Sequence, residues 1–497
     1  SPEVLDGAGP SSSTLGTGNA GNVEIRASDR VTFSGTSEDG QFSSAAFSSV
    51  AVGGRGDGGN VEIRTDTLEV RDGSGLSSST FGTGNAGNVV IEADRIDLDG
   101  VGADGLSSGI FTVTGADATG RGGAVTITVP ELQISNGAVI NARTENARRG
   151  GNITLDLGQL TLTDGGQVIT STLGASRAGN ILVHAERVQI SGSDPTLAQR
   201  LEEFGSDQVF NESNGASGLF TNTRSDSSGD GGNITLRLND LEMNDSAVLS
   251  AQSQGTGTAG RLTVRAQGNV ILTDSDLTTS AEQSSGGAIF VSAGDIRLFG
   301  DSDITTFVQS GEGGGGDITL RGDTIVAFSD SDILAFSVDG SGGNITLDTR
   351  AFFGENYRPA TGILTREQIE ALDGNDRVDI NATGQVQSGD IITPDTSFIQ
   401  NSLSNLSETV IDTEGLLANS CIARTTQGNT FLITGGGGLP ERPGDLPIAT
   451  YSTGDVRSIP DGQESSDEAW QFGDPIMEPQ GVYQLPDGRL VLSRECS

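Results

Sequence analysis

The segment GNITLDLGQLTLTDGGQVITST, residues 151–172, alternates in character over three short runs. The residues expected to face inward are spaced two apart, at Ile153 and Leu155, at Leu160 and Leu162, and at Val168 and Thr170. A period of two is that of a β-strand, and the Gly, Asp and Asn residues between the runs favour turns. The segment therefore predicts three short strands joined by tight turns.

The opening phrase of this segment recurs along the chain: a glycine, usually an asparagine, then two aliphatic residues on either side of one outward residue. The phrases begin at Gly21, Gly59, Gly87, Gly123, Gly151, Gly179, Gly232, Gly260, Gly287, Gly316 and Gly343, with spacings of 38, 28, 36, 28, 28, 53, 28, 27, 29 and 27 residues. A fixed repeat with a few insertions predicts a solenoid, in which each unit stacks on its neighbours.

The second aliphatic pair of each unit keeps a constant register, nine and eleven residues after the unit glycine. It recurs at Leu68 and Val70, Ile96 and Leu98, Leu132 and Ile134, Val188 and Ile190, and Ile296 and Leu298. The turns are too short for the ~10 helical residues per repeat of leucine-rich and helical solenoids. The predicted fold is all-β: a right-handed parallel β-helix, a three-sheet solenoid of about 11 coils of about 28 residues, with an irregular C-terminal extension. At ~4.8 Å per coil the predicted rod is roughly 50 Å long.

Charge excludes some partners. The chain has 67 acidic residues against 28 cationic ones, all arginine, and a net charge of −39. Such a surface repels nucleic acid and anionic lipid, so we expect no nucleic-acid partner. No apolar run approaches the ~20 residues that span a bilayer, so we expect no membrane insertion. The composition fits a secreted or cell-surface, extracellular protein, although acidity alone identifies no partner.

One stretch is nearly duplicated. Residues 11–23, SSSTLGTGNAGNV, recur at 77–89 with Phe81 in place of Leu15, which indicates tandem duplication. Residues 5–21 correspond to the middle of the unit at 71–87, so the sequence starts in mid-unit. We therefore expect it to be the C-terminal part of a longer exported polypeptide.

Several phrases carry a resemblance that covers essentially the whole chain. They are STxGTGNAGNVxI, the later units of the form GGNITL, RAFFGENY at 350–357, LDGNDRVDINATG at 372–384, PDTSFIQNSL at 394–403, LLANSCIAR at 416–424, FLITGGGGLPERPGD at 431–445 and EPQGVYQLPDGRLVLSREC at 478–496. In these the chain resembles the C-terminal region of large cyanobacterial exoproteins of the filamentous haemagglutinin type.

The resemblance implies export through an outer-membrane transporter of a two-partner secretion system, followed by folding outside the cell into a right-handed β-helical fibre. It also implies a role in adhesion or in a surface layer. The family's N-terminal secretion domain is not among these residues, and the family does not fix a receptor. A host or neighbouring cell surface, a polysaccharide and a second copy of the chain all stay open as partners.

The repeat also predicts domain limits. We expect β-helical coils over residues 1–350 with an insertion at 193–218, an irregular end or cap over 351–403, and a C-terminal extension over 404–497. In the insertion, Asp194-Pro195 predicts the start of a short helix that carries Leu197, Leu201 and Phe204 against the side of the coils.

The region after residue 350 should keep some regular structure. A second helix is predicted from Thr365, as its N-cap, to Leu372, with Ile369 and Leu372 facing inward. Irregular strands are predicted at 378–380 and 391–392, and a strand-like segment from Gly481 to Ser493. Residues 437–480, rich in proline, are expected to be flexible.

The two cysteines, Cys421 and Cys496, both lie in the extension. An even count in an exported protein favours a disulfide between them, with two free thiols as the alternative. A catalytic cysteine is disfavoured because the only histidine, His184, lies some 240 residues away at an outward strand position.

An enzyme is the less favoured alternative, as a carbohydrate-active β-helix. Catalytic carboxylates need different surroundings so that one acts as acid and the other as base. The repeated Asp-Ser-Asp motif instead gives each copy the same surroundings, and Trp470 and the three tyrosines lie outside the regular coils. The motif stands fourteen residues after three successive unit glycines, at Asp274 and Asp276, Asp301 and Asp303, and Asp330 and Asp332.

Two interpretations of this motif stay open. Aspartates are turn formers at wet edges, which is the favoured interpretation, and a bridging calcium ion is the alternative and the only cofactor considered. The segment DGNDRVD at 373–379 resembles a calcium loop only in composition and is interpreted as a turn.

The asparagines of the repeated phrase are expected to form a structural ladder along the axis, each amide donating to the next. They are Asn22, Asn60, Asn88, Asn152, Asn180, Asn233 and Asn344, and the exceptions, Ala124, Arg261, Ala288 and Asp317, should be weak positions in it. The sequence as a whole favours a non-enzymatic secreted or cell-surface fibre or adhesin module. A self-assembling surface-layer or sheath component is the first alternative.

Overall fold

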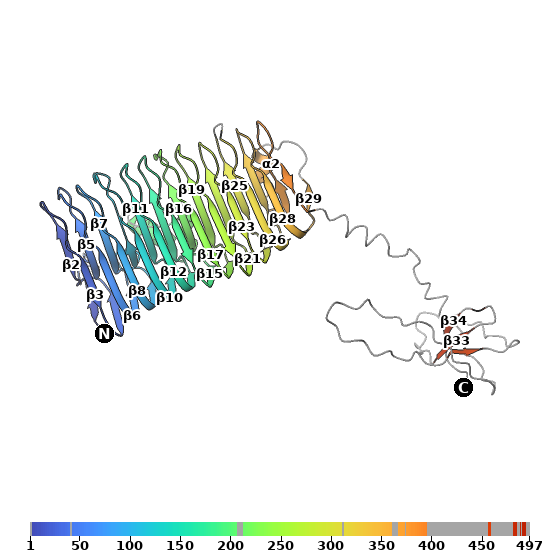
Figure 1. Cartoon of the computed structure of the whole chain (residues 1–497), viewed down its shortest axis with the longest axis horizontal. Coiled ribbons are helices and arrows are strands. Elements are labelled where there is room, and N and C mark those ends of the chain that lie inside the picture. Colours follow the sequence, from blue (N-terminus) through green and yellow to red (C-terminus); the bar gives the residue numbers. More distant parts are fainter. Residues whose placement is uncertain are drawn as a thin grey trace. The chain divides into compact units, whose positions relative to one another are not determined.

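The computed structural model describes residues 2–39, 42–205, 212–310, 313–359, 366–372, 374–394, 456–458, 481–484, 488 and 490–493. The chain divides into two units, Ser1–Asp395 and Thr396–Ser497. In the first unit, strands lie side by side in chain order from the blue to the orange end of Figure 1. No helix among the described residues is both long and apolar enough to cross a membrane.

Two long sheets make up the first unit, and their strands pair in parallel. The larger one has 18 strands: β1 (Glu3–Leu5), β3 (Val23–Arg26), β4 (Arg30–Ser34), β6 (Val61–Arg71), β8 (Val89–Asp99), β10 (Val125–Ser135), β12 (Ile153–Thr163), β14 (Ile181–His184), β15 (Arg187–Ser191), β17 (Ile234–Leu238), β18 (Asp240–Asn244), β20 (Leu262–Ala266), β21 (Asn269–Thr273), β23 (Ile289–Ser292), β24 (Asp295–Phe299), β26 (Ile318–Ala327), β28 (Ile345–Gly354) and β31 (Ile391–Ile392).

The second sheet has 13 strands, which alternate in the chain with those of the first. They are β2 (Ser11–Thr14), β5 (Ala45–Val50), β7 (Gly75–Thr80), β9 (Gly109–Phe111), β11 (Val139–Thr144), β13 (Gln167–Thr172), β16 (Gly218–Thr223), β19 (Val248–Ser253), β22 (Asp276–Ala281), β25 (Ile304–Val308), β27 (Ile333–Ser337), β29 (Arg358–Pro359) and β30 (Asp379–Asn381).

The all-β class and the parallel sheets are confirmed, but the first two of the three predicted runs belong to one sheet. In β12, for example, residues 153–163 form one strand, whose two halves pair with β14 and β15 in the next repeat. The runs join because no turn separates them, whereas Asp164 and Gly165, both with positive φ, turn the chain before β13.

Pairing follows the repeat and builds a dry core between the sheets. Ile153 pairs with Val125 on one side and Ile181 on the other. The first aliphatic residues of the repeated phrase form one interior column and are buried, with at most 7 % of any member exposed: Val23, Val61, Val89, Ile153, Ile181, Ile234 and Ile345. The second column is buried as well, for example at Leu160 and Leu162.

The unit glycines lie where neighbouring repeats stack backbone on backbone. A Cβ added to Gly151 would lie 1.7 Å from the carbonyl oxygen of Gly123, and the same contact recurs at Gly179 with 1.6 Å. On several repeats a hydroxyl donates to the oxygen of such a glycine, as Thr170 does to Gly179 at 2.8 Å and Thr221 to Gly232 at 2.8 Å. Any side chain at this position would therefore separate the repeats.

We expect Gly151→Ala to lower the free energy of unfolding by about 3 kcal/mol or more, because the added methyl group meets backbone that cannot move aside. Urea denaturation measures the change. Gly16→Ala is the matched control, since no atom lies within 4 Å of a Cβ at that position and its φ is not positive. A loss at Gly16 as large as that at Gly151 would contradict the stacking explanation.

The predicted helix of the insertion is confirmed as α1 (Leu197–Phe204), and a 3₁₀ turn follows at Ser213–Gly215. Leu197 is buried as predicted, and Phe204 covers Gly105. Arg200 is buried too, which the apolar spacing did not predict, because it forms an ion pair with the buried Asp194 and donates to the Gly105 carbonyl oxygen at 3.3 Å.

The second predicted helix is confirmed as α2 (Arg366–Glu370), although Thr365 lies outside the described residues. Ile369 and Leu372 are buried against Leu334 and Phe336 of β27. The predicted strands near 379 and 391 are confirmed as β30 and β31. In the second unit, β32 (Val456–Ser458) pairs in parallel with β33 (Gly481–Gln484), which pairs antiparallel with β34 (Leu490–Ser493).

Candidate functional site

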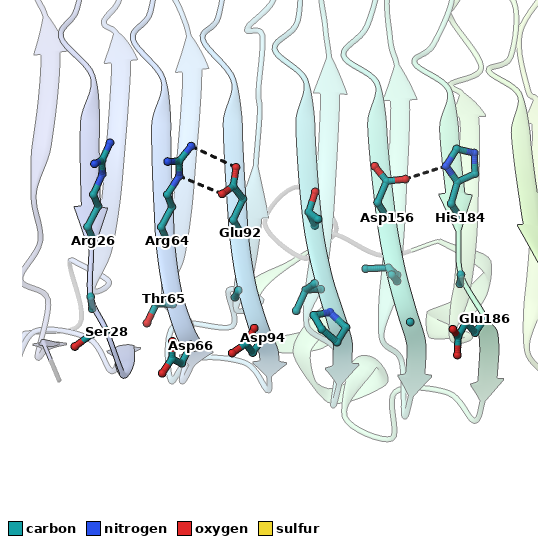
Figure 2. A pocket seen from close by; sticks show the side chains of 18 of the residues that line it. Arg26, Ser28, Arg64, Thr65, Asp66, Glu92, Asp94, Asp156, His184 and Glu186 are labelled. Atoms are coloured by element: carbon teal, nitrogen blue, oxygen red, sulfur yellow. Dashed lines mark hydrogen bonds and ion pairs between the residues drawn. The ribbon is translucent and has the colours of Figure 1, made fainter.

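A groove crosses the larger sheet where its long strands bend between their two halves. It has a volume of about 1420 Å³ and crosses β3, β6, β8, β10, β12 and β14, reaching Arg237 in β17. Figure 2 shows it with the strands side by side and their outward side chains in two rows. We call it the axial groove, because it runs from repeat to repeat and not along any strand.

One wall of the axial groove is formed by a single register position of the sheet. Its residues are paired in sequence from one repeat to the next, and the position continues beyond the groove: Arg26, Arg64, Glu92, Thr128, Asp156, His184, Arg237, Arg265, Ser292, Arg321 and Asp348. The alternation of each strand points them outward, since the residues before them, such as Ile63 and Leu155, are buried.

The charges of this first wall are largely matched within the wall. Arg64 binds Glu92 through two contacts of 3.2 and 3.3 Å, and His184 Nδ1 lies 2.8 Å from Asp156 Oδ1. Figure 2 shows both pairs spanning neighbouring strands. The side chains of Arg64 and Glu92 are both 52 % exposed, so the pair contributes little to stability. It does hold two charges in place beside the floor.

The floor of the groove is made of small or apolar residues at the bend. They are Ala27, Thr65, Ala93, Val129, Pro130, Leu157, Gly158 and Ala185. Several of them, including Ala93 and Leu157, pack on the core from outside. At Gly158 a Cβ would lie 2.7 Å from the carbonyl oxygen of Pro130, so the backbone itself forms the floor there.

The second wall carries carboxylates. Asp66, Asp94 and Glu186 are exposed along it, and Figure 2 shows them on the side of the floor opposite to Arg64 and His184. Within the described ranges no arginine or histidine forms an ion pair with any of the three. The two walls therefore differ: one is charge-matched and the other is acidic.

The groove brings carboxylates, arginines and one histidine together at repeated register positions. The register neighbours of His184 are Asp156, a carboxylate, and Arg237, a cation. No Phe, Tyr or Trp side chain is among the described residues that line the groove. Its carboxylates stand at repeated, solvent-exposed positions, whereas acid and base roles need contrasting surroundings.

The Asp-Ser-Asp motifs lie at the turns that lead into β22, β25 and β27. Their serines are buried and fix the turn, as in the bond from Ser302 Oγ to the Phe299 carbonyl oxygen at 2.7 Å. The second aspartate of each motif accepts the backbone N–H of its counterpart one repeat on. Asp276 accepts from Asp303 at 3.2 Å and Asp303 from Asp332 at 2.9 Å.

Asp332 departs from the predicted wet edge, and for this residue the prediction is wrong. Its side chain is fully buried, because the segment leading into β30 covers it and the Asp379 N–H donates to its Oδ1 at 2.7 Å. Its Oδ2 is buried with no hydrogen-bond partner. Burial, and then the nearby charges of Asp303, Asp379 and Asp330, raise the pKa of Asp332 to about 9.

The calcium interpretation gains no geometric support. Among the described residues, no group of three or more His, Cys, Asp or Glu side chains is arranged to hold a metal ion. Asp274, Asp276, Asp301 and Asp303 do line one open hollow at this corner. Since backbone N–H groups already occupy oxygens of Asp274, Asp276 and Asp303, screening by any cation is the favoured account.

We therefore expect sodium chloride at equal ionic strength to raise the melting temperature as much as calcium chloride does, because Debye screening depends on ionic strength and not on ligand geometry. Differential scanning fluorimetry, with a chelator-treated sample as the reference, measures both. A gain specific to calcium that Asp303→Asn abolishes would contradict this expectation.

The asparagine ladder differs in its bonds from the prediction. The side-chain oxygen of each asparagine accepts the backbone N–H of the next repeat, as from Asn60 to Asn22 at 2.8 Å and from Asn180 to Asn152 at 2.9 Å. An amide donates along the axis as predicted at Asn88, to Asn60 at 3.4 Å. Asn344 also donates, to Asp317 at 3.1 Å.

The four exceptions in the ladder are not equivalent. Asp317 also accepts the Asn344 N–H at 2.8 Å, so it is no weak position. Ala124 and Ala288 have no side-chain acceptor, and the arginine at 261 has only donors, so these three cannot continue the ladder.

Two predicted site residues lie outside the described ranges, and several residues of the axial groove were not predicted from the sequence. Cys421 and Cys496 lie outside the described residues, so their disulfide stays a prediction. Asp66, Asp94, Glu186 and Arg237 were not predicted as a site. Their only sequence signal is an outward position near the middle of the repeat.

Glu212 was not predicted as a site residue either. Its carboxyl group is buried, and this burial raises its pKa. It accepts from Asn222 at 2.8 Å, and Arg224 lies 3.2 Å away.

Comparison of the chain with protein-family models, with curated proteins and with solved structures finds no match.

Proposed function

We propose that the chain is a module of a non-enzymatic secreted or cell-surface fibre, an adhesin-like rod of the filamentous haemagglutinin type. In this proposal residues 1–350 wind as a right-handed parallel β-helix that presents outward side chains to a partner. The observation that carries the proposal is the unbroken parallel register of equivalent residues from repeat to repeat, from β3 through β12 to β28.

Such a register suits a scaffold. A stack of repeats can present an extended binding surface while each repeat contacts only its neighbours. The unit glycines and the asparagine ladder serve that stacking, since their bonds run to the next repeat. The outward positions are left for function, and some of them line the axial groove.

The resemblance supplies the rest of the proposal: export by a two-partner secretion system, a cyanobacterial origin and an extracellular site of action. The repetition of the groove's carboxylates at equivalent, exposed positions favours a binding role over a carbohydrate-active enzyme, since acid and base roles need contrasting surroundings. Candidate partners at this level are another cell surface, a polysaccharide or a second copy of the chain.

Electron microscopy of the purified chain tests the architecture. We expect isolated rods with a long dimension of roughly 50 Å for the stacked repeats, from ~4.8 Å per repeat. Ordered arrays would instead favour the self-assembling surface-layer alternative, and compact globular particles would contradict the β-helix.

Localisation needs a separate experiment. A tagged full-length protein should be digested by protease added to intact source cells, while a cytoplasmic control protein stays intact. Protection of the tagged protein to the same degree as the control would contradict a surface role.

A further inference from the structure

The axial groove has an acidic wall beside an apolar floor. A scaffold that only stacks its repeats does not need this combination. Asp66 and Asp94 stand in neighbouring repeats, and Glu186 stands three repeats beyond Asp94 on the same wall. Between them the wall and floor carry Pro130 and Gly158, which have no charge. The groove therefore presents two groups of carboxylates separated by roughly 14 Å, at ~4.8 Å per repeat.

These carboxylates differ from the other charges of the groove. The facing wall satisfies its own acids, since Glu92 binds Arg64 and Asp156 binds His184. Asp66, Asp94 and Glu186 take no part in any ion pair formed within the described residues. The residues that line the groove include three arginines and five carboxylates, so the groove is acidic. The whole chain is acidic too, with a net charge of −39.

We propose that the axial groove docks an extended peptide segment with cationic side chains, supplied by a partner protein. The segment would lie across the strands, with its aliphatic portions on the floor around Ala93 and Leu157. Its positive groups would reach Asp66 and Asp94 at one end and Glu186 at the other. The proposal deepens the binding role of the groove and rests on the proposed function in that respect.

Length and charge both fit this occupant. Six repeats span about 24 Å, which an extended segment of about seven residues covers at ~3.4 Å per residue. Lysine and arginine stems bury their methylene groups on apolar surface while the charged ends reach carboxylates. The strong net negative charge also steers a cationic segment to the surface, and salt weakens that steering.

An anionic oligosaccharide fits less well. It would have to use Arg26, Arg64 and Arg237, of which the first two form ion pairs with Glu24 and Glu92. It would also lie against the carboxylates of the second wall. No Phe, Tyr or Trp side chain among the described lining residues is present to stack on a sugar.

The test is fluorescence anisotropy with the intact chain and two labelled probes: an eight-residue peptide of alternating arginine and valine, and an oligogalacturonate of similar length. We expect the peptide to bind and the oligogalacturonate not to compete. The triple variant Asp66→Asn, Asp94→Asn, Glu186→Gln should weaken peptide binding about tenfold, since three exposed charge contacts are lost.

The matched control removes the same charges elsewhere. Asp117→Asn, Asp226→Asn, Glu202→Gln neutralises two aspartates and one glutamate that are exposed outside the groove. Peptide affinity should change less than twofold in this variant. Ala185→Trp keeps every charge but fills the floor, and it should weaken binding as much as the groove triple variant.

Three outcomes would overturn the proposal. They are an equal loss in both triple variants, which means generic attraction to an acidic protein; unchanged affinity in Ala185→Trp; and displacement of the peptide by the oligogalacturonate, which means a sugar site. Circular dichroism establishes that each variant is folded. Imaging of rods is independent of all these results, so failure of the docking proposal and failure of the fibre proposal are distinguishable.

Discussion

Asp332→Asn is expected to raise the free energy of unfolding at neutral pH and to remove much of its decline with rising pH. Asp332 is fully buried, and its Oδ2 has no hydrogen-bond partner. Its pKa is raised from 3.8 to about 9, first by burial and then by the charges of Asp303, Asp379 and Asp330. The folded protein thus holds a proton that the unfolded chain releases.

The sign of the effect follows from proton linkage. A group with a raised pKa in the folded state gives stability that is complete below its unfolded pKa, here about 3.8, and is lost as pH rises to the folded pKa of about 9. At pH 7 this linkage lowers the free energy of unfolding by at most roughly 4 kcal/mol for a shift of this size. Asparagine is neutral throughout and escapes this loss.

Urea denaturation of both proteins at pH 4.5, 6, 7.5 and 9 measures the difference. The groups that face Asp332 are Asp303 from the preceding repeat, Asp330 in its own turn, and Asp379 with its ion-pair partner Arg377. Asp117→Asn, at an exposed position, controls for the general loss of one negative charge. Equal pH profiles for Asp332→Asn and the wild-type protein would contradict a buried, protonated carboxyl group.

The burial of Asp332 could not be read from the sequence. Three copies of the Asp-Ser-Asp motif are the same in sequence, yet the second aspartates Asp276 and Asp303 are partly exposed while their counterpart Asp332 is buried. The difference arises only because the segment 374–381 returns over the last motif and ends in β30. Repetition predicts equal surroundings for the middle of a stack and cannot predict them for its end.

The repeated strands, by contrast, could be predicted in detail, because one register of period two recurs at a constant distance from each glycine. Ile153 and Leu160 are buried as their alternation indicates. The division into three sheets failed, since the bend inside a strand such as β12 leaves no turn residues to mark it. That same bend forms the axial groove, so the groove could not be predicted either.

The buried ion pair between Arg200 and Asp194 was also not predicted from the sequence. Hydrophobic spacing predicted Leu197, Leu201 and Phe204 as the inward face of α1 and did not include Arg200. Arg200 is buried because Asp194, six residues earlier, neutralises it. A pattern of apolar residues carries no information about such a pair.

Ile153→Asp is expected to have the largest effect on the stacked repeats. The side chain of Ile153 is fully buried in the interior column, between Val125 and Ile181 of the neighbouring repeats. The substitution removes a buried aliphatic group and places a carboxylate among aliphatic neighbours without a partner. We expect a loss of about 5 kcal/mol or more in the free energy of unfolding.

Two further variants serve as controls for Ile153→Asp. Thr154→Asp adds the same charge one residue away, at an outward and partly exposed position, and should change stability by less than about 1 kcal/mol. Ile153→Val keeps the fold with a loss of about 1 kcal/mol, and it allows measurement if the aspartate variant does not fold. Because each repeat contacts only its neighbours, limited proteolysis of Ile153→Asp should cut first near residues 125–181. Similar losses for Ile153→Asp and Thr154→Asp would mean that the assigned faces of β12 are wrong, since a reversed register would exchange the buried and the exposed residue along the whole strand.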